Sequence, residues 1–177
     1  MTSDRDREFA EFVAVSSVAL QRTAFLVCAD RDHAADAVQE ALYRLYVSWP
    51  KFQRATNPMA YARRAVVNAA VDAGRRPWRR ERVVDAMPET PSEDTAGQHA
   101  VRDELLSALR ELPPRRRACV ALRYYEDLTI EETAEILGCS IGTVKSQTAR
   151  GLETLRKSLV ARRAQELRPE QLTGGRS

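Results

Sequence analysis

The sequence has few of the residues that build metal sites and disulfide frameworks. Its 177 residues include only three cysteines and two histidines. Cys28, Cys119 and Cys139 are scattered along the chain, and no two of them form a CxxC pair. We therefore expect no metal, no other cofactor and no disulfide framework. Buried free thiols in a reducing compartment are the simpler interpretation.

A long apolar run, a signal-peptide pattern and a catalytic constellation are also missing. No stretch is apolar over the roughly 20 residues that a bilayer requires, so the sequence predicts no membrane segment. The N-terminus carries no signal-peptide pattern, and we expect a cytoplasmic protein. Because no Ser/His/Asp, Cys/His or metal-ligand spacing occurs, we expect that the protein is not an enzyme.

Aromatic residues make up only 6% of the chain, whereas alanine and arginine are abundant and β-branched runs are short. This composition favours an all-α fold. The formal net charge is only +3, so charge alone does not establish a nucleic-acid partner. Its distribution is more informative. Basic residues crowd one segment, namely Arg63, Arg64, Arg75, Arg76, Arg79, Arg80 and Arg82, whereas acidic residues gather near the N-terminus and at residues 89–94.

Residues 127–159 predict two helices joined by a tight turn. The first helix covers Ile130 to Leu137 with Ala134 facing inward, and Gly138 supplies the left-handed turn residue. Ser140 can cap the second helix through its hydroxyl. A buried stripe of the second helix consists of Val144, Thr148, Leu152, Leu155 and Leu159. The opposite stripe holds Thr143, Ser146, Gln147 and Arg150, and Lys145 lies beside it. These side chains can reach base edges or phosphates in a major groove. This pattern predicts a DNA-binding helix-turn-helix, and an ordinary helical hairpin with a solvated polar face is the alternative.

Three helices are predicted before residue 76, over Asp4 to Cys28, Asp32 to Trp49 and Pro58 to Arg75. Asp30 or Asp32 caps the second of them, and Asn57 caps the third. The expected inward faces hold Phe9, Phe12, Val13, Ser16 and Leu20, then Ala35, Val38, Leu42, Leu45, Tyr46 and Trp49, then Tyr61, Ala62, Ala65, Val66, Ala69 and Ala73. Residues 51–57 read as a loop. The basic third helix with its aromatic loop fits nucleic-acid binding as well as it fits a solvated surface.

The segment 77–97 has three prolines, several acids and no periodic pattern, which predicts a flexible linker. The chain thus divides into two small helical domains, 1–76 and 98–162, followed by a polar tail, 163–177. The second domain begins with a helix that buries Val101, Leu105, Leu109 and Leu112 and ends before Pro113. A further helix begins near Pro114 and leads into the helix-turn-helix.

Several of these stretches together resemble one family, the extracytoplasmic-function sigma factors of bacterial RNA polymerase. Residues 36–49 resemble sigma regions 2.1–2.2, residues 57–76 resemble regions 2.3–2.4, and residues 109–156 resemble region 4. The sequence SQTARGLETLR, with YYEDLT before it, is similar to the actinobacterial SigE-like subgroup. The resemblance covers most of the chain outside the linker and the termini. Departures are Thr133, where the family usually has an aliphatic residue, and the small Ala62 and Ala65.

The resemblance implies a protein that binds core RNA polymerase, recognises a promoter and helps to melt it. It implies contacts with the β′ clamp helices and the β flap of the polymerase, with promoter DNA both duplex and single-stranded, and with a possible anti-sigma factor. The residues that match the polymerase-docking helix are Asp36, Gln39 and Glu40, which spacing alone would leave as a solvated face. Residues matching the −10 element surface are Phe52, Gln53, Arg54, Arg63, Arg64 and Asn68, and those matching the −35 reading helix are Thr143, Lys145, Ser146, Gln147 and Arg150.

Two alternatives compete with this interpretation. A stand-alone repressor or activator could carry the same helix-turn-helix, but it leaves the basic third helix and its preceding loop without a role. A DNA recombinase would need a nucleophile and arginines on a folded α/β domain. The only early serine pair, Ser16 and Ser17, lies in a helical pattern without strands, which argues against the recombinase.

Overall fold

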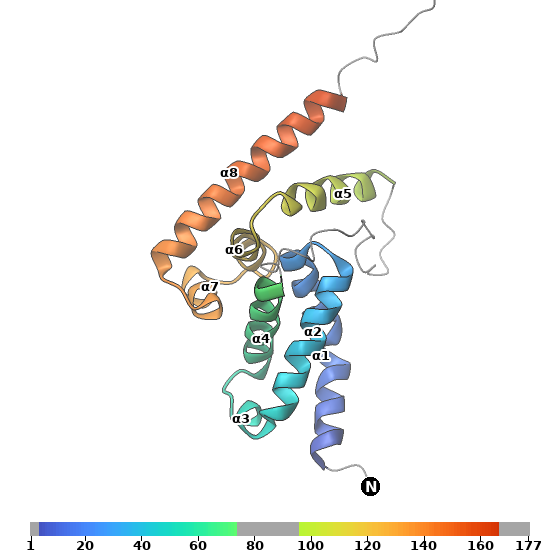
Figure 1. Ribbon diagram of the computed structural model, residues 1–177, viewed down its shortest axis with the longest axis vertical. Helices are drawn as coiled ribbons and strands as arrows, with labels where there is room; N and C mark the ends of the chain where they lie inside the picture. The colour runs from blue at the N-terminus through green and yellow to red at the C-terminus, as the bar shows by residue number, and fades with distance from the viewer. Residues whose placement is uncertain (1–3, 74–95, 167–177) are drawn as a thin grey trace, which may run out of the picture.

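The computed structural model describes residues 4–73 and 96–166, and within these ranges every regular element is a helix (Figure 1). The expected all-α fold is confirmed. The helices are α1 (Asp4–Cys28), α2 (Arg31–Val47), α3 (Trp49–Gln53), α4 (Pro58–Ala73), α5 (Ala96–Arg110), α6 (Pro114–Tyr124), α7 (Ile130–Leu137) and α8 (Ile141–Glu166). Most of the predicted linker and most of the predicted tail lie outside the described residues. α8 continues to Glu166, so the last helix runs past the predicted end of the second domain.

The first unit is a bundle of α1, α2 and α4, which pack against one another along their lengths. Side chains that satisfy free backbone N–H groups fix where its helices begin. The Asp30 carboxylate accepts a hydrogen bond from the His33 N–H at 2.8 Å, and the Asn57 side chain accepts one from the Ala60 N–H at 3.0 Å. Both predicted caps are therefore in place. The predicted inner face of α2 is slightly rotated, since Ala35 is exposed and Ala34 is buried.

The segment predicted as a loop after Pro50 begins as the short helix α3, which closes one end of the bundle. Its aromatic rings explain this position. Trp49 and Phe52 stack with centroids 4.9 Å apart, and Phe12 of α1 meets Phe52 edge-on at 4.8 Å. Both α3 rings are almost fully buried. Aromatic pairs in these geometries stabilise a fold beyond the area that they bury.

The second unit contains α5 to α8, and its helix-turn-helix matches the prediction closely. Thr129 and Glu132 form a capping box at the start of α7, in which each side chain accepts a hydrogen bond from the other residue's N–H. Gly138 has φ +58° and ends α7 in the left-handed conformation. The Ser140 hydroxyl accepts a hydrogen bond from the Thr143 N–H at 3.1 Å. Thr133, the departure from the family pattern, is fully buried and donates its hydroxyl hydrogen bond to the Thr129 carbonyl.

Two predicted inner stripes of the second unit are rotated by about one residue. In α8, Leu152 is partly exposed and Gly151 faces α6 in its place. In α5, Leu105 and Val101 are exposed, whereas Leu106 is buried. The helical period fixes the spacing of the apolar residues. The positions of the neighbouring helices decide which of these residues become buried.

The two units pack directly on each other, with α6 and α7 set against the end of the bundle opposite α3 (Figure 1). The C-terminal end of α1 is held by arginines of the second unit. Arg117 donates to the carbonyls of Cys28 and Leu112, and Arg110 donates to the carbonyl of Ala29 at 2.9 Å. Cations at this position are favourable because the last carbonyls of a helix are unpaired and carry partial negative charge.

The helix α1 meets the length and hydropathy of a membrane span, with a mean hydropathy of 1.3 over its most apolar window. The sequence was expected to contain no apolar run long enough to span a membrane. By length and composition alone, α1 contradicts that expectation. Its inner side, however, belongs to the bundle core, where Leu20, Ala24 and Phe25 are almost completely buried. Core helices of this kind pass the same test, so the helix is weak evidence for a membrane.

Candidate nucleic-acid and partner interfaces

Most of the side chains that are predicted to read DNA from α8 are exposed. Thr143, Lys145, Ser146 and Arg150 are all exposed, and Gln147 is half-buried. Gln147 accepts a hydrogen bond from the Arg116 guanidinium of α6 at 3.3 Å. This bond ties α8 to α6. The residues on the opposite side, Val144 and Leu155, are buried. The structure thus exposes four of the five predicted side chains and holds the fifth, Gln147, against α6.

Two of the predicted −10 residues of α4, Arg63 and Arg64, contact the second unit. Arg63 forms an ion pair with Glu126 at 3.0 Å, and its side chain is 18% exposed. Arg64 is more exposed and lies 3.9 Å from Glu135. Asn68 is half-buried one turn further along. Sequence reasoning gave no sign of Glu126, because its partner lies in the other helical unit.

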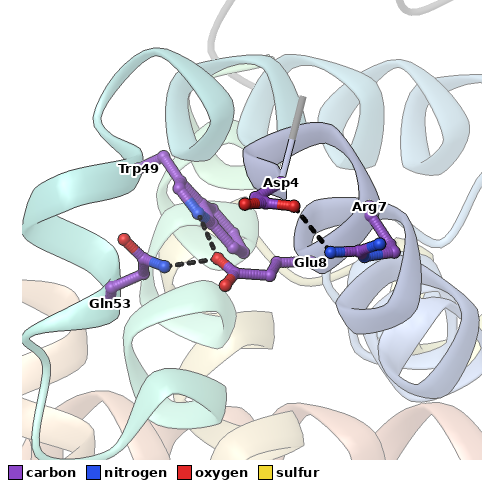
Figure 2. Close-up of polar contacts among 5 residues, drawn as sticks. All are labelled: Asp4, Arg7, Glu8, Trp49 and Gln53. Atoms are coloured by element: carbon purple, nitrogen blue, oxygen red, sulfur yellow. Dashed lines mark hydrogen bonds and ion pairs between the residues drawn. The ribbon is translucent and has the colours of Figure 1, made fainter. Parts of the chain in front are cut away.

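The three predicted −10 residues around α3 have different environments. Phe52 is buried among other aromatic rings, so in this structure it supports the surface from beneath. Gln53 and Arg54 are exposed. Glu8 of α1 organises this corner, since its carboxylate accepts hydrogen bonds from the Gln53 amide at 2.5 Å and the Trp49 indole N–H at 3.4 Å (Figure 2).

Glu8 was not among the predicted residues. Its place near the start of α1 is far in sequence from α3, and no local pattern could have indicated the contact. In Figure 2 the Asp4–Arg7 pair, at 2.6 Å, lies beside Glu8 on the same helix. The corner that presents Gln53 is thus anchored by α1, although α1 itself carries none of the predicted binding residues.

The predicted polymerase-binding residues form one exposed acidic surface on α2. Asp36, Gln39 and Glu40 line a shallow groove between α2 and α4, together with Tyr43. Glu40 pairs with Arg44 at 2.7 Å one turn along the helix, and both side chains are more than half exposed. An exposed ion pair of this kind contributes little to stability. Glu40 can therefore exchange Arg44 for a group on a partner at little cost in folding free energy.

The cysteines were expected to be buried, but only Cys119 is fully so, whereas Cys28 and Cys139 are partly buried. Burial raises the pKa of the Cys28 thiol to about 12 and that of the Cys119 thiol to about 11, so both stay protonated and unreactive at neutral pH. All three cysteines are free. Within residues 4–73 and 96–166 no group of His, Cys, Asp and Glu side chains could hold a metal ion.

An exposed helix-turn-helix on one unit and a basic helix on another define a class of DNA-binding transcription factor. Comparisons with known proteins make this specific. The family model "Sigma-70 region 2" matches residues 15–80, and "Sigma-70, region 4" matches residues 102–155. The "RNA polymerase sigma-E factor" of Streptomyces coelicolor is 39% identical over 155 residues, which are 88% of each chain. This chain therefore belongs to the sigma-70 family of RNA polymerase sigma factors, in its extracytoplasmic-function type.

Two further similarities agree with this assignment. The "ECF RNA polymerase sigma factor SigE" of Mycolicibacterium smegmatis is 32% identical over 158 residues, covering 84% of this chain and 60% of the relative. The sigma factor RpoE from Bartonella quintana, solved in complex with the anti-sigma factor NepR, has a TM-score of 0.66 at 22% identity. That alignment covers 87% of this chain and 98% of RpoE, and it supports the fold.

Proposed function

We propose that this sigma factor divides promoter recognition between its two helical units and uses α2 to dock on core polymerase. The proposed domain limits are residues 1–76 and 98–162, joined by a linker at 77–97. In this proposal Asp36, Gln39 and Glu40 bind the β′ clamp helices. The second unit contacts the β flap and reads the −35 duplex through α8.

The observation that carries the proposal is the single exposed polar face of α8. Its polar side chains point away from the unit, while Val144 and Leu155 on the opposite side are buried against the rest of the helix-turn-helix. A helix held in this way can enter a major groove, where arginine, lysine, glutamine and small hydroxyl side chains recognise base edges or phosphates.

The −10 element requires different chemistry, because its bases must leave the duplex to be recognised. Arg63, Arg64 and Asn68 lie on one side of α4, and Gln53 and Arg54 follow from the adjacent corner. Cationic side chains attract the single strand, and amides can hydrogen-bond an unpaired base edge. Capture of flipped bases offsets an unstacking cost of a few kcal/mol per base. RNA synthesis itself belongs to the polymerase, so this chain performs no catalytic step.

The proposal extends to regulation and location. RpoE is described in complex with an anti-sigma factor, and we propose that an anti-sigma factor also binds this chain. We further propose that the protein acts in the cytoplasm, where polymerase and promoters are found. The helix α1 then serves only as a core element of the first unit.

Run-off transcription with core polymerase on a promoter library tests the proposal directly. The expected result is promoter-specific RNA only when the chain and core polymerase are both present. A stand-alone regulator is the competing function, and it would bind duplex DNA tightly without polymerase and yield no opened promoter. Permanganate footprinting on the same templates distinguishes these outcomes, because it detects unpaired thymines.

A further inference from the structure

The hydrogen bonds of Glu8 determine which side of the Gln53 amide faces solvent. The Gln53 nitrogen donates to a Glu8 carboxylate oxygen at 2.5 Å, and the same oxygen accepts a hydrogen bond from the Trp49 indole N–H at 3.4 Å. Figure 2 shows the amide nitrogen turned toward Glu8 and the amide oxygen turned away from it. A carboxylate only accepts hydrogen bonds, so a reversed amide would set two acceptors against each other. Glu8 therefore holds this side chain in one orientation.

Buried aromatic rings hold the corner that carries Gln53. Trp49 and Phe52 are only 4% and 3% exposed, and their rings stack with centroids 4.9 Å apart. Phe52 also meets Tyr61 of α4 edge-on at 5.9 Å. Because the indole N–H of Trp49 donates to Glu8, a ring fixed in the core holds the carboxylate in place. Gln53 itself is exposed, so its outward oxygen can meet a ligand.

Arg54 supplies a positive charge directly after Gln53. Its Nε donates to the Pro50 carbonyl at 2.9 Å, which leaves the two terminal guanidinium nitrogens of this exposed side chain to meet a phosphate. A cation that positions the DNA backbone thus stands beside an amide that can read a base. Glu8 repels phosphates, so affinity for DNA does not explain a carboxylate in this corner. Control of the amide orientation does explain it.

We propose that Glu8 is a positioning residue that sets the base preference of this corner through Gln53. The proposal rests on the −10 role proposed above for Gln53. An outward amide oxygen accepts a hydrogen bond. Adenine and cytosine offer an exocyclic amino group, N6 or N4, where guanine and thymine carry a carbonyl oxygen, O6 or O4. The corner therefore prefers an unpaired adenine or cytosine to a guanine or thymine.

The experiment measures base preference by run-off transcription with the full-length chain and core polymerase. The templates are randomised across the −10 element, and a barcode in the transcribed region identifies each template. The position at which Q53A abolishes the preference is the position that Gln53 reads. We expect wild type to favour adenine or cytosine there by roughly 5- to 10-fold, and Q53A to bring the ratio within about twofold.

Three substitutions of Glu8 separate positioning from simple support. E8Q keeps an oxygen that can accept from both Gln53 and Trp49, so it should keep the wild-type ratio. E8A removes the acceptor and lets the Gln53 amide rotate, which should bring the ratio within about twofold. E8K replaces the acceptor with a donor. Gln53 should then turn its oxygen inward and its NH₂ group outward, and the preference should move toward guanine or thymine.

E11K is the matched control for the added charge of E8K. Glu11 is exposed and lies about one turn further along α1. An added cation attracts the phosphates of every template alike and carries no sequence information. E11K can therefore change the total yield, but it should keep the wild-type base ratio. Circular dichroism checks the helical content of each variant, and if E8K loses helix, E8A and Q53A decide the test.

Nuclear magnetic resonance tests the amide orientation without polymerase or DNA. In isotope-labelled protein, the bond to Glu8 should move one side-chain amide proton of Gln53 away from the position of a solvated glutamine. Q53A assigns this signal by its disappearance. E8Q should retain the displaced signal, and E8A should return it to the solvated position. A Gln53 signal that already lies there in wild type contradicts the proposal.

The outcomes separate this proposal from the proposed function. If E8A lowers the yield on all templates equally and keeps the base ratio, Glu8 only supports α3 and the proposal is rejected. A wild-type preference for guanine or thymine at the Gln53 position, or a −10 profile that Q53A does not change, also rejects it. Promoter-specific RNA from wild type leaves the sigma-factor assignment intact in each case. Absence of such RNA from wild type across the whole library instead rejects the proposed function, and the reading role of Gln53 with it.

Discussion

Gly151 of α8 lies directly against Val120 of α6. A Cβ atom at Gly151 would stand 2.6 Å from Val120 Cγ2 and 3.2 Å from the Cγ of Arg116. The absence of a side chain at this position therefore lets the two helices approach closely. Because Arg116 also holds Gln147, this contact sets the position of the DNA-reading helix relative to α6.

We predict that G151A destabilises the protein by about 1–2 kcal/mol, since the added methyl overpacks a contact formed by a β-branched side chain. G142A is the matched control on the same helix. Its Cβ would meet nothing closer than Ser140 Oγ at 3.8 Å, and alanine's helix propensity should leave stability unchanged or slightly raised. Urea unfolding followed by circular dichroism measures both. V120A should relieve the strain, so V120A/G151A should lose less than the sum of the single losses.

The exposed basic residues of α8 should determine upstream promoter binding. We predict that K145A and R150A each weaken promoter binding in the polymerase complex and make its salt dependence shallower, because each removes one phosphate or base contact. A residue that reads a base should also relax the preference at one position, by roughly 1–3 kcal/mol. K157A is the control, since Lys157 is exposed on the same helix but pairs with Glu153. Wild-type transcription by both variants across a salt series would show that α8 is not the reader.

The acidic face of α2 should determine polymerase docking. We predict that Q39A/E40A weakens association with core polymerase while helical content stays the same, because both side chains are exposed and neither packs in the core. Co-purification of tagged protein with core enzyme measures the effect, and E11A on the outer side of α1 provides a matched surface control. Equal retention of the double variant and wild type would place the docking surface elsewhere.

Asn68 should act at promoter opening. We predict that N68A still binds core polymerase and the −35 duplex, because those surfaces lie on α2 and α8, but forms fewer open complexes. Its amide is positioned to hydrogen-bond a base edge only after that base has left the stack. Permanganate reactivity and run-off yield are compared on closed and pre-melted templates, and pre-melting should restore part of the activity. Normal opening of closed duplex by N68A argues against a −10 role.

Local signals predicted the helix limits well, because each capping side chain acts within a few residues of its own position. Asp30, Asn57 and Gly138 all behave as their sequence context indicates. The sequence was less informative about the side of each helix that is covered. Gly151 takes the inward position that was expected for Leu152, since helical periodicity does not specify where a neighbouring helix lies.

Contacts between distant segments could not be predicted from one sequence. Phe52 fits an exposed aromatic loop in the sequence, but rings from α1 and α4 enclose it. Arg63 carries no sign of Glu126, and Gln53 carries none of Glu8. Each of these pairs exists only because the fold brings together helices that are far apart along the chain, so their discovery required coordinates.

The arginines at the end of α1 have a practical consequence for dissecting this protein. Carbonyl groups of Cys28 and Ala29 are completed by Arg117 and Arg110, which lie beyond the linker. A fragment cut within the linker would leave the last turn of α1 uncapped and the buried faces beneath the second unit open to water. Such a fragment would differ from the same residues in the intact chain, so affinities measured on separated halves would describe a different species from the protein in which the two units pack together.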